Sequence, residues 1–281
     1  MSNAPASIGA NSRSPFAGCA ILIAAMLVMV FLVVFSTWGL FRQYNEIVKF
    51  TGSDPIPVEV TPLEAHEAEA NLLAEKLEKF RQELVGDQVT QLTLTPADLN
   101  LAIAAYEPFL ELRNTFRVLA IEGDTLKIAI SFKLNGKPRL ARAGESGWMT
   151  SDPRYLNGTL LAKPQLLGKE VVLQLTAIEV PNATVPVEFR EQMSPYRITE
   201  RYLAHPVIGP LMAKLTAVEV ANGTLILKRN PAEVPGDRIS AAQVDSASAR
   251  LFKLLGLVAC VFLLGVGILI FVGLRAKARK A

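Results

Sequence analysis

Two long apolar segments near the ends of the chain constrain its fold more than any other feature of the sequence. The first covers residues 17–35 and the second residues 254–274, and neither contains a charged residue. At 1.5 Å per residue, each segment is long enough to cross the roughly 30 Å hydrocarbon core of a bilayer as a helix. We therefore predict two transmembrane helices, at 17–40 and 254–274, with a folded domain between them.

A cleaved signal peptide is the alternative interpretation of the first segment. Signal peptides have an apolar core of roughly 7–15 residues and a small-x-small cleavage site soon after it. The segment here is longer, and no such site follows it closely. An uncleaved membrane anchor is therefore the favoured interpretation.

Basic residues near the membrane indicate which way the chain is threaded. Arg275, Lys277, Arg279 and Lys280 lie in the last seven residues, which contain no acid. Such a cluster favours the cytoplasmic side. We expect cytoplasmic tails at 1–16 and 275–281 and an extracytoplasmic domain, reached through a linker at 41–60 and a connector at 231–253. In a bacterium, the protein would be in the inner membrane.

The charges and cysteines of the middle stretch exclude several classes of function. Residues 44–249 hold 21 Lys and Arg against 26 Asp and Glu, a net charge of −5. A nucleic-acid-binding surface needs basic residues clustered on the folded domain, so no nucleic-acid partner is expected. Cys19 and Cys260 lie in or beside the apolar segments, which leaves the domain without a disulfide or thiolate metal site. We expect no cofactor and no metal.

Residues 61–230 have the pattern of an α+β domain. Thr61-Pro62-Leu63-Glu64 and Thr95-Pro96-Ala97-Asp98 each combine an N-cap, a helix-starting proline and an acid, and predict helices at 61–86 and 95–108. Further helical pieces are expected at 187–193 and 198–214, and a loop at 136–154. Strands are predicted at 89–94, 115–122, 125–134, 155–162, 169–180, 216–220 and 224–227. The predicted fold is a curved antiparallel sheet packed on helices, flanked by the two transmembrane helices.

Two of the predicted strands each present an apolar face. Their inward positions are Leu126, Ile128, Ile130 and Phe132 in one strand, and Val171, Leu173 and Leu175 in the other. Alternation with polar residues indicates a sheet that is dry on one side and wet on the other. The dry face is either an ordinary core against the helices or an apolar groove for a lipid-like ligand, for which these seven residues are the candidates.

Basic residues gather around the predicted loop. Arg139, Arg142 and Arg154 are candidates for contact with anionic lipid headgroups, through an attraction of about 1 kcal/mol per residue near the surface. The alternative is that they form a solubilising rim.

The residues that could support catalysis are few and do not form a known arrangement. His66 and His205 have no metal-ligand spacing, and Ser146 lies between glycines in the predicted loop without the GxSxG motif of a strand-to-helix turn. We therefore predict that the protein is not an enzyme.

Several segments carry a family resemblance. They are 92–100, which contains Leu-Thr-Pro-Ala-Asp-Leu-Asn, the paired strands within 119–134, and 155–160, 171–180 and 215–227. This succession resembles the YpmS, YceB and LmeA group of envelope proteins, whose fold is similar to the tubular lipid-binding superfamily. The resemblance implies binding of a hydrophobic ligand, with Asp98, Leu99 and Asn100 in capping and packing roles. The second apolar segment and the long first helix depart from the group, and a domain tethered at both ends cannot shuttle lipid freely.

Together these patterns predict a membrane protein whose extracytoplasmic domain binds lipid or another apolar molecule near the bilayer. The alternative is an envelope scaffold or protein-interaction module with a filled core and no ligand.

Overall fold

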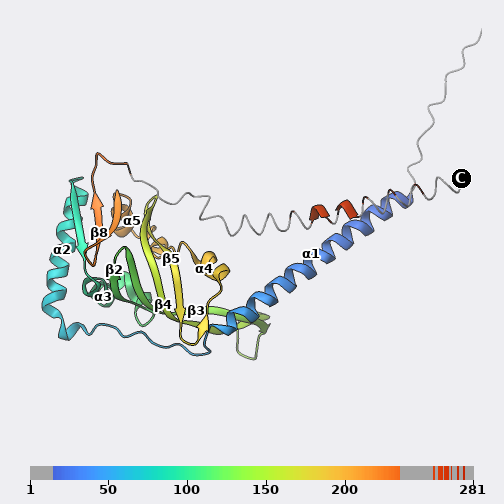
Figure 1. The fold of residues 1–281 in the computed structure, drawn as a ribbon, viewed down its shortest axis with the longest axis horizontal. Helices are drawn as coiled ribbons and strands as arrows, with labels where there is room; N and C mark the ends of the chain where they lie inside the picture. Colours follow the sequence, from blue (N-terminus) through green and yellow to red (C-terminus); the bar gives the residue numbers. More distant parts are fainter. Residues whose placement is uncertain are drawn as a thin grey trace, which may run out of the picture. The chain divides into compact units, whose positions relative to one another are not determined.

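The computed structural model describes residues 15–234 and a few isolated positions between 256 and 275 (Figure 1). The chain divides into two compact units, and the boundary on the N-terminal side lies between Arg42 and Gln43. The predicted tails at 1–16 and 275–281, the connector at 231–253 and the second membrane segment at 254–274 lie wholly or largely outside the described residues.

Helix α1 runs from Pro15 to Lys49. Within the described part of the chain it is the one helix long and apolar enough to cross a membrane. It continues beyond residue 40, so the expected linker at 41–60 begins as helix. Ile47 and Phe50 are buried in the hydrophobic core of the second unit, and this packing explains why the helix persists up to the domain.

Two helices follow the two predicted start sequences, one of them later than expected. The first start gives only a short 3₁₀ turn, Leu63–Ala65, and α2 spans Glu67–Val85. The second gives α3, Pro96–Ala105, with the predicted capping box. A 3₁₀ helix, Glu107–Leu112, comes after α3.

A five-stranded antiparallel sheet forms the larger part of the domain. Its strands are β2 (Phe116–Glu122), β3 (Thr125–Leu140), β4 (Met149–Leu167), β5 (Glu170–Val180) and β6 (Ala183–Thr184), in that spatial order. The expected loop at 136–154 is wrong, because β3 and β4 pair as far as Leu140 and Met149. The ladder is irregular between Asn135 and Pro138, and this interruption, with the prolines and glycines there, hides the strand pattern in the sequence.

The last hairpin belongs to a second sheet, where one curved sheet was expected. Strands β7 (Ala217–Ala221) and β8 (Thr224–Arg229) join β1 (Thr90–Leu94) in the order β1-β8-β7. The turn between β7 and β8 has φ of 52° at Asn222 and 73° at Gly223, as the Asn-Gly pair predicts. The three short helical pieces are α4 (Val187–Met193), a 3₁₀ turn (Glu200–Tyr202) and α5 (Ile208–Met212).

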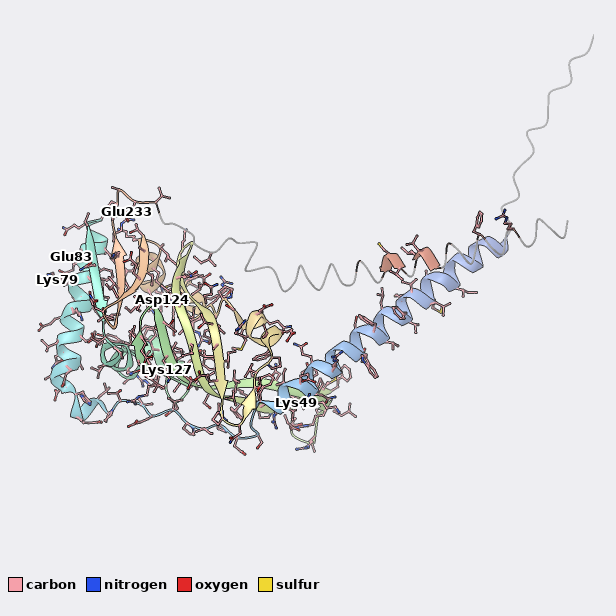
Figure 2. All side chains as sticks on the ribbon, viewed as in Figure 1. Lys49, Lys79, Glu83, Asp124, Lys127 and Glu233 are labelled. Atoms are coloured by element: carbon pink, nitrogen blue, oxygen red, sulfur yellow. The ribbon has the colours of Figure 1, made fainter. Side chains whose placement is uncertain are left out.

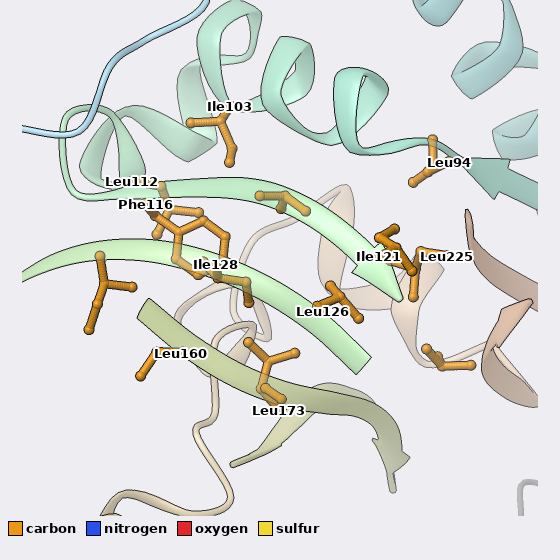
Figure 3. Close-up of a cluster of buried hydrophobic side chains, with 14 of the residues drawn as sticks. Leu94, Ile103, Leu112, Phe116, Ile121, Leu126, Ile128, Leu160, Leu173 and Leu225 are labelled. Atoms are coloured by element: carbon orange, nitrogen blue, oxygen red, sulfur yellow. The ribbon is translucent and has the colours of Figure 1, made fainter. Parts of the chain in front are cut away.

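Side chains from both sheets and from the helices share one hydrophobic core (Figure 3). Its residues include Leu94, Ile103, Leu112, Phe116, Ile121, Leu126, Ile128, Leu160, Leu173 and Leu225. The predicted α+β class, with antiparallel strands packed on helices, is confirmed.

Candidate functional site

The seven predicted apolar-ligand residues lie on one face of the five-stranded sheet. Four of them are on β3 and three on β5, with β4 between these strands. Ala162 of β4 pairs with both Leu126 and Leu175, so the two apolar stripes are joined in register across the sheet. The alternation seen in the sequence therefore brings these residues together in space.

Five of the seven are part of the filled core. Leu126, Ile128, Ile130, Leu173 and Leu175 have exposed fractions between 0 and 5%. A side chain that lined an empty cavity would lose contacts and keep accessible surface, so these side chains are enclosed by protein atoms. Only Phe132 and Val171 are partly exposed. In this structure the middle of the sheet face is core.

Phe132 makes a contact that reveals the curvature of the sheet. Its ring stacks on that of Tyr196, with 5.3 Å between centroids and 27° between planes. Tyr196 pairs with the edge of β5, through hydrogen bonds of 2.8 and 2.9 Å to Leu173. Three strand spacings of about 4.8 Å would separate the two rings on a flat sheet. The contact therefore requires the sheet to bend towards its apolar face.

Other half-buried apolar side chains lie on the same strand as Phe132 and on α4. We call Phe132, Leu134, Phe189, Met193 and Tyr196 the apolar rim; all five pack against the core while staying partly exposed. They come from β3, from α4 and from the segment that follows α4. Burial raises the pKa of the Tyr196 phenol, which places its hydroxyl in an apolar setting.

The apolar rim lies next to the end of α1. The Phe50 ring packs on that of Phe189 at a centroid distance of 4.8 Å, and Gln43 donates a 3.2 Å hydrogen bond to Gln192. Just after α1, Gly52 forms an antiparallel bridge with Tyr155 of β4. The apolar rim is therefore at the end of the domain where the chain enters from the apolar helix.

Two of the three arginines predicted to meet lipid headgroups are engaged within the protein. Arg139 donates to both oxygens of Glu145 at 2.7 Å and to Asp152 at 2.8 Å. These hydrogen bonds raise the arginine pKa and lower that of Glu145 to about 2. Arg154 donates to the carbonyl oxygens of Val48 and Thr51, which caps the C-terminal end of α1.

Arg142 is the third arginine, and its side chain is exposed. Its backbone N–H donates to Glu145 at 2.7 Å. Its guanidinium makes no hydrogen bond or ion pair with any residue that the structure describes. Of the three candidates, Arg142 is the one whose side chain is exposed and makes no direct ion pair with a described residue, although its charge contributes to the lowered pKa of Glu145.

Sequence reasoning missed an apolar cluster at the end of the β3–β4 hairpin. We call residues 140–149 the hairpin tip. Leu140, Trp148 and Met149 there are 73, 75 and 50% exposed. Three large apolar residues in a ten-residue segment were a usable signal, but the segment was interpreted as a loop and judged by its charges alone.

The residues weighed for catalysis lie apart and have other surroundings. The His205 Nδ1 accepts from the backbone N–H groups of Val207 and Ile208 at the start of α5. His66 precedes α2, and Ser146 is exposed in the hairpin tip. No cluster of His, Cys, Asp or Glu that could hold a metal ion occurs within the described part of the chain.

Comparisons with known proteins complete this description of the site. No family model, no curated protein and no solved structure matches the chain.

Proposed function

We propose that this protein is a membrane-anchored, non-enzymatic lipid-binding protein. Its domain takes up part of a membrane lipid, or another apolar molecule, at the apolar rim. The observation that carries the proposal is the half-buried Phe132–Tyr196 stack, together with the packing of Phe189 on Phe50 at the end of an apolar helix long enough to cross a bilayer. The proposed site is therefore the apolar rim and not the middle of the sheet face, whose residues form the core.

The membrane topology is part of the proposal. Helix α1 is the first span, residues 254–274 are the second, and the basic tail at 275–281 keeps both termini cytoplasmic. The domain is then extracytoplasmic, on the outer side of a bacterial inner membrane. Tethering holds the apolar rim near the bilayer, which raises the effective concentration of lipid around it.

The chemistry of the apolar rim suits an acyl chain better than a polar substrate. Aromatic and methionine side chains form an adaptable apolar surface with large contact area. Among the five rim residues the only polar group is the Tyr196 hydroxyl, a phenol that is neutral near pH 7 and whose pKa burial raises further. A neutral apolar surface of this kind favours contact with hydrocarbon and gives little specificity for a headgroup.

Photochemical labelling of the full chain tests the proposal. The protein is reconstituted with a phospholipid that carries a photoactivatable diazirine on its acyl chain, and the labelled peptides are mapped by mass spectrometry. Labelling of peptides that contain Phe132, Met193 or Tyr196 supports the proposal. Labelling confined to the membrane helices contradicts it.

A matched pair of variants separates binding at the apolar rim from chance proximity. Met193→Glu introduces a charge into the apolar rim, and we expect several-fold weaker labelling of Phe132 and Tyr196. Leu72→Glu introduces the same charge at an exposed apolar position on α2 and should leave the labelling unchanged.

The second candidate function is a protein-interaction module without a ligand. The near-complete burial of Ile128, Ile130 and Leu173 favours it, because these side chains leave no space for an apolar molecule on the sheet face. Under this alternative, the apolar rim is an extension of the core. Met193→Glu would then lower the stability of the domain, and the apolar rim would not be labelled by lipid in either the unmodified protein or the variant.

A further inference from the structure

The hairpin tip carries three exposed apolar side chains that none of the residues described by the structure covers. Leu140 and Met149 are partners across the β3–β4 ladder, so their side chains are neighbours on one face. Trp148 is adjacent, and its carbonyl oxygen accepts from the Ala141 N–H at 3.2 Å. Exposed tryptophan, leucine and methionine at one tip are unfavourable in water unless another apolar phase receives them.

A network of ion pairs keeps the hairpin tip in shape. Arg139 contacts Glu145 within the turn and Asp152 on the opposite strand. Glu145 also accepts from the Arg142 N–H, which closes the turn. The apolar residues therefore sit on a braced hairpin, and the acids near Arg139 are neutralised by it, whereas the Arg142 charge is left exposed.

The base of the same hairpin is attached to the end of α1. Gly52 and Tyr155 exchange hydrogen bonds of 2.8 and 2.9 Å, and Arg154 binds the Val48 carbonyl oxygen at 3.2 Å. From Arg154 the hairpin continues to Met149, which is about 17 Å at 3.4 Å per residue. The part of α1 beyond the expected span, residues 41–49, is about 14 Å long at 1.5 Å per residue. The hairpin beyond Arg154 is thus at least as long as the part of α1 that lies outside the expected span.

We propose that the hairpin tip inserts Trp148, Leu140 and Met149 into the interfacial layer of the bilayer that α1 crosses. Tryptophan is favoured at this depth because its ring is apolar and its N–H can stay hydrated. Arg142 places its charge at the phosphate level while its methylene groups follow the apolar residues inward. The inference rests on the membrane anchoring in the proposed function, but not on a ligand at the apolar rim.

The membrane, not a partner protein, is the favoured occupant for two reasons. The hairpin tip is short, and it carries an exposed cation in the same segment as its apolar residues, which complements an anionic lipid surface. It is also joined through the chain to α1, and this tether raises the effective concentration of bilayer surface around the hairpin tip.

The two tryptophans of the chain, Trp38 and Trp148, make the inference directly measurable. The full-length Trp38→Phe protein, with Trp148 as its one tryptophan, is placed in bilayers whose phospholipids carry bromine near the headgroup end of the acyl chain. We expect these lipids to quench Trp148 strongly, and acrylamide in the water to quench it weakly. Strong quenching by acrylamide without quenching by the brominated lipids overturns the inference.

Two controls use the same chain. Trp38→Phe/Trp148→Phe/Val89→Trp places the reporter at an exposed position six residues after Glu83, which lies at the opposite end of the domain from Lys49 (Figure 2). We expect no lipid quenching there. Trp148→Phe leaves Trp38 on α1 as the reporter of membrane anchoring. If Trp38 is quenched and Trp148 is not, the inference fails and the proposed function stands; if neither is quenched, both fail.

Discussion

Asn100 of α3 and Val118 of β2 exchange two hydrogen bonds through the amide of the asparagine side chain. The Asn100 Nδ2 donates to the Val118 carbonyl oxygen at 2.8 Å, and the Val118 N–H donates to Asn100 Oδ1 at 2.9 Å. The side chain thereby imitates a neighbouring strand at the point where the β2–β3 register shifts. It fixes α3 on the sheet and satisfies two backbone groups at a bulge.

We expect Asn100→Ala to lower the free energy of unfolding by about 2–3 kcal/mol, because it leaves a part-buried N–H and C=O without partners. Thermal unfolding of the full chain in detergent, followed by circular dichroism, measures the loss. Asn135→Ala, at an exposed asparagine of β3, is the matched control and should change stability little. Equal effects of the two substitutions would contradict a bridging role for Asn100.

The second prediction compares a core residue with one of the apolar rim. Ile128→Ala should cost about 2–5 kcal/mol because Ile128 is fully buried. Phe132→Ala should cost about 2 kcal/mol, less than is usual for a buried phenylalanine, because its ring is half-exposed on Tyr196. A loss of about 3–5 kcal/mol for Phe132→Ala, with unchanged lipid labelling, would favour the filled-core alternative.

The third prediction concerns the start of α3. Thr95 Oγ1 accepts from the Asp98 N–H at 3.1 Å, and the Asp98 carboxylate accepts from the Thr95 N–H at 2.9 Å and from Lys76 at 3.2 Å. Thr95→Ala should cost about 1 kcal/mol. Thermal unfolding of the two proteins under the same conditions checks this value.

Asp98 also makes this helix start sensitive to pH. Burial alone would raise its pKa, but the hydrogen bonds from Thr95 and Lys76 outweigh burial and hold it below the ordinary 3.8. The stabilisation is therefore present above pH 3.8 and is lost as the pH falls below it. In Asp98→Asn, this part of the acid dependence should disappear; an unchanged acid profile of unfolding would contradict the assignment.

The fourth prediction concerns the bracing of the hairpin tip. The hydrogen bonds from Arg139, with that from the Arg142 N–H, lower the pKa of Glu145 from 4.5 to about 2. A lowered carboxyl pKa means that the bracing is complete above pH 4.5 and is lost only as the pH falls towards 2. Trp148 fluorescence anisotropy, in the Trp38→Phe protein in detergent, should therefore stay constant between pH 7 and about pH 4.

Glu145→Gln provides the contrast for this measurement. It removes the charge that binds Arg139, so the anisotropy of Trp148 should already be lower at pH 7. Asp152→Asn removes the more exposed of the two partners of Arg139 and should have a smaller effect. A midpoint near pH 4.5 in the parent protein would show that Glu145 is not bound.

Local sequence signals were sufficient for much of the fold. The Thr95–Asp98 capping box, the Asn222-Gly223 turn and the alternation of β3 each depend on neighbouring residues, and each is found in the structure. The start of α2 was wrong by several residues, because the segment after Thr61 and Pro62 forms a 3₁₀ turn, Leu63–Ala65, and α2 begins only at Glu67.

Features that depend on residues far apart in the chain could not be predicted from local sequence patterns. Nothing in β1 indicates that its partner is β8, so the second sheet was missed. The outer half of the β3–β4 hairpin lacks a buried face, and without one the sequence carries no alternation to detect. Periodicity is imposed by burial, so a strand that projects from the core loses it.

The candidate site shows the same division. Sequence alternation placed Leu126, Leu175 and their neighbours on one face correctly, but whether that face is covered depends on the helices packed against it. The arginines were identified by charge, yet the partners of Arg139 and Arg154 became evident only with the hairpin and the end of α1 in place. The apolar residues of the hairpin tip were the strongest signal that was passed over.

The pairing of Thr90 with Arg229 determines when the domain can be completed. The ribosome synthesises β1 long before its partner β8. β1 therefore stays unpaired while all five strands of the larger sheet are synthesised. Until then its edge is open to pairing with other chains. A chain that stopped before residue 224 would keep most of its core residues but not the strand that closes the small sheet, and it would be prone to aggregation.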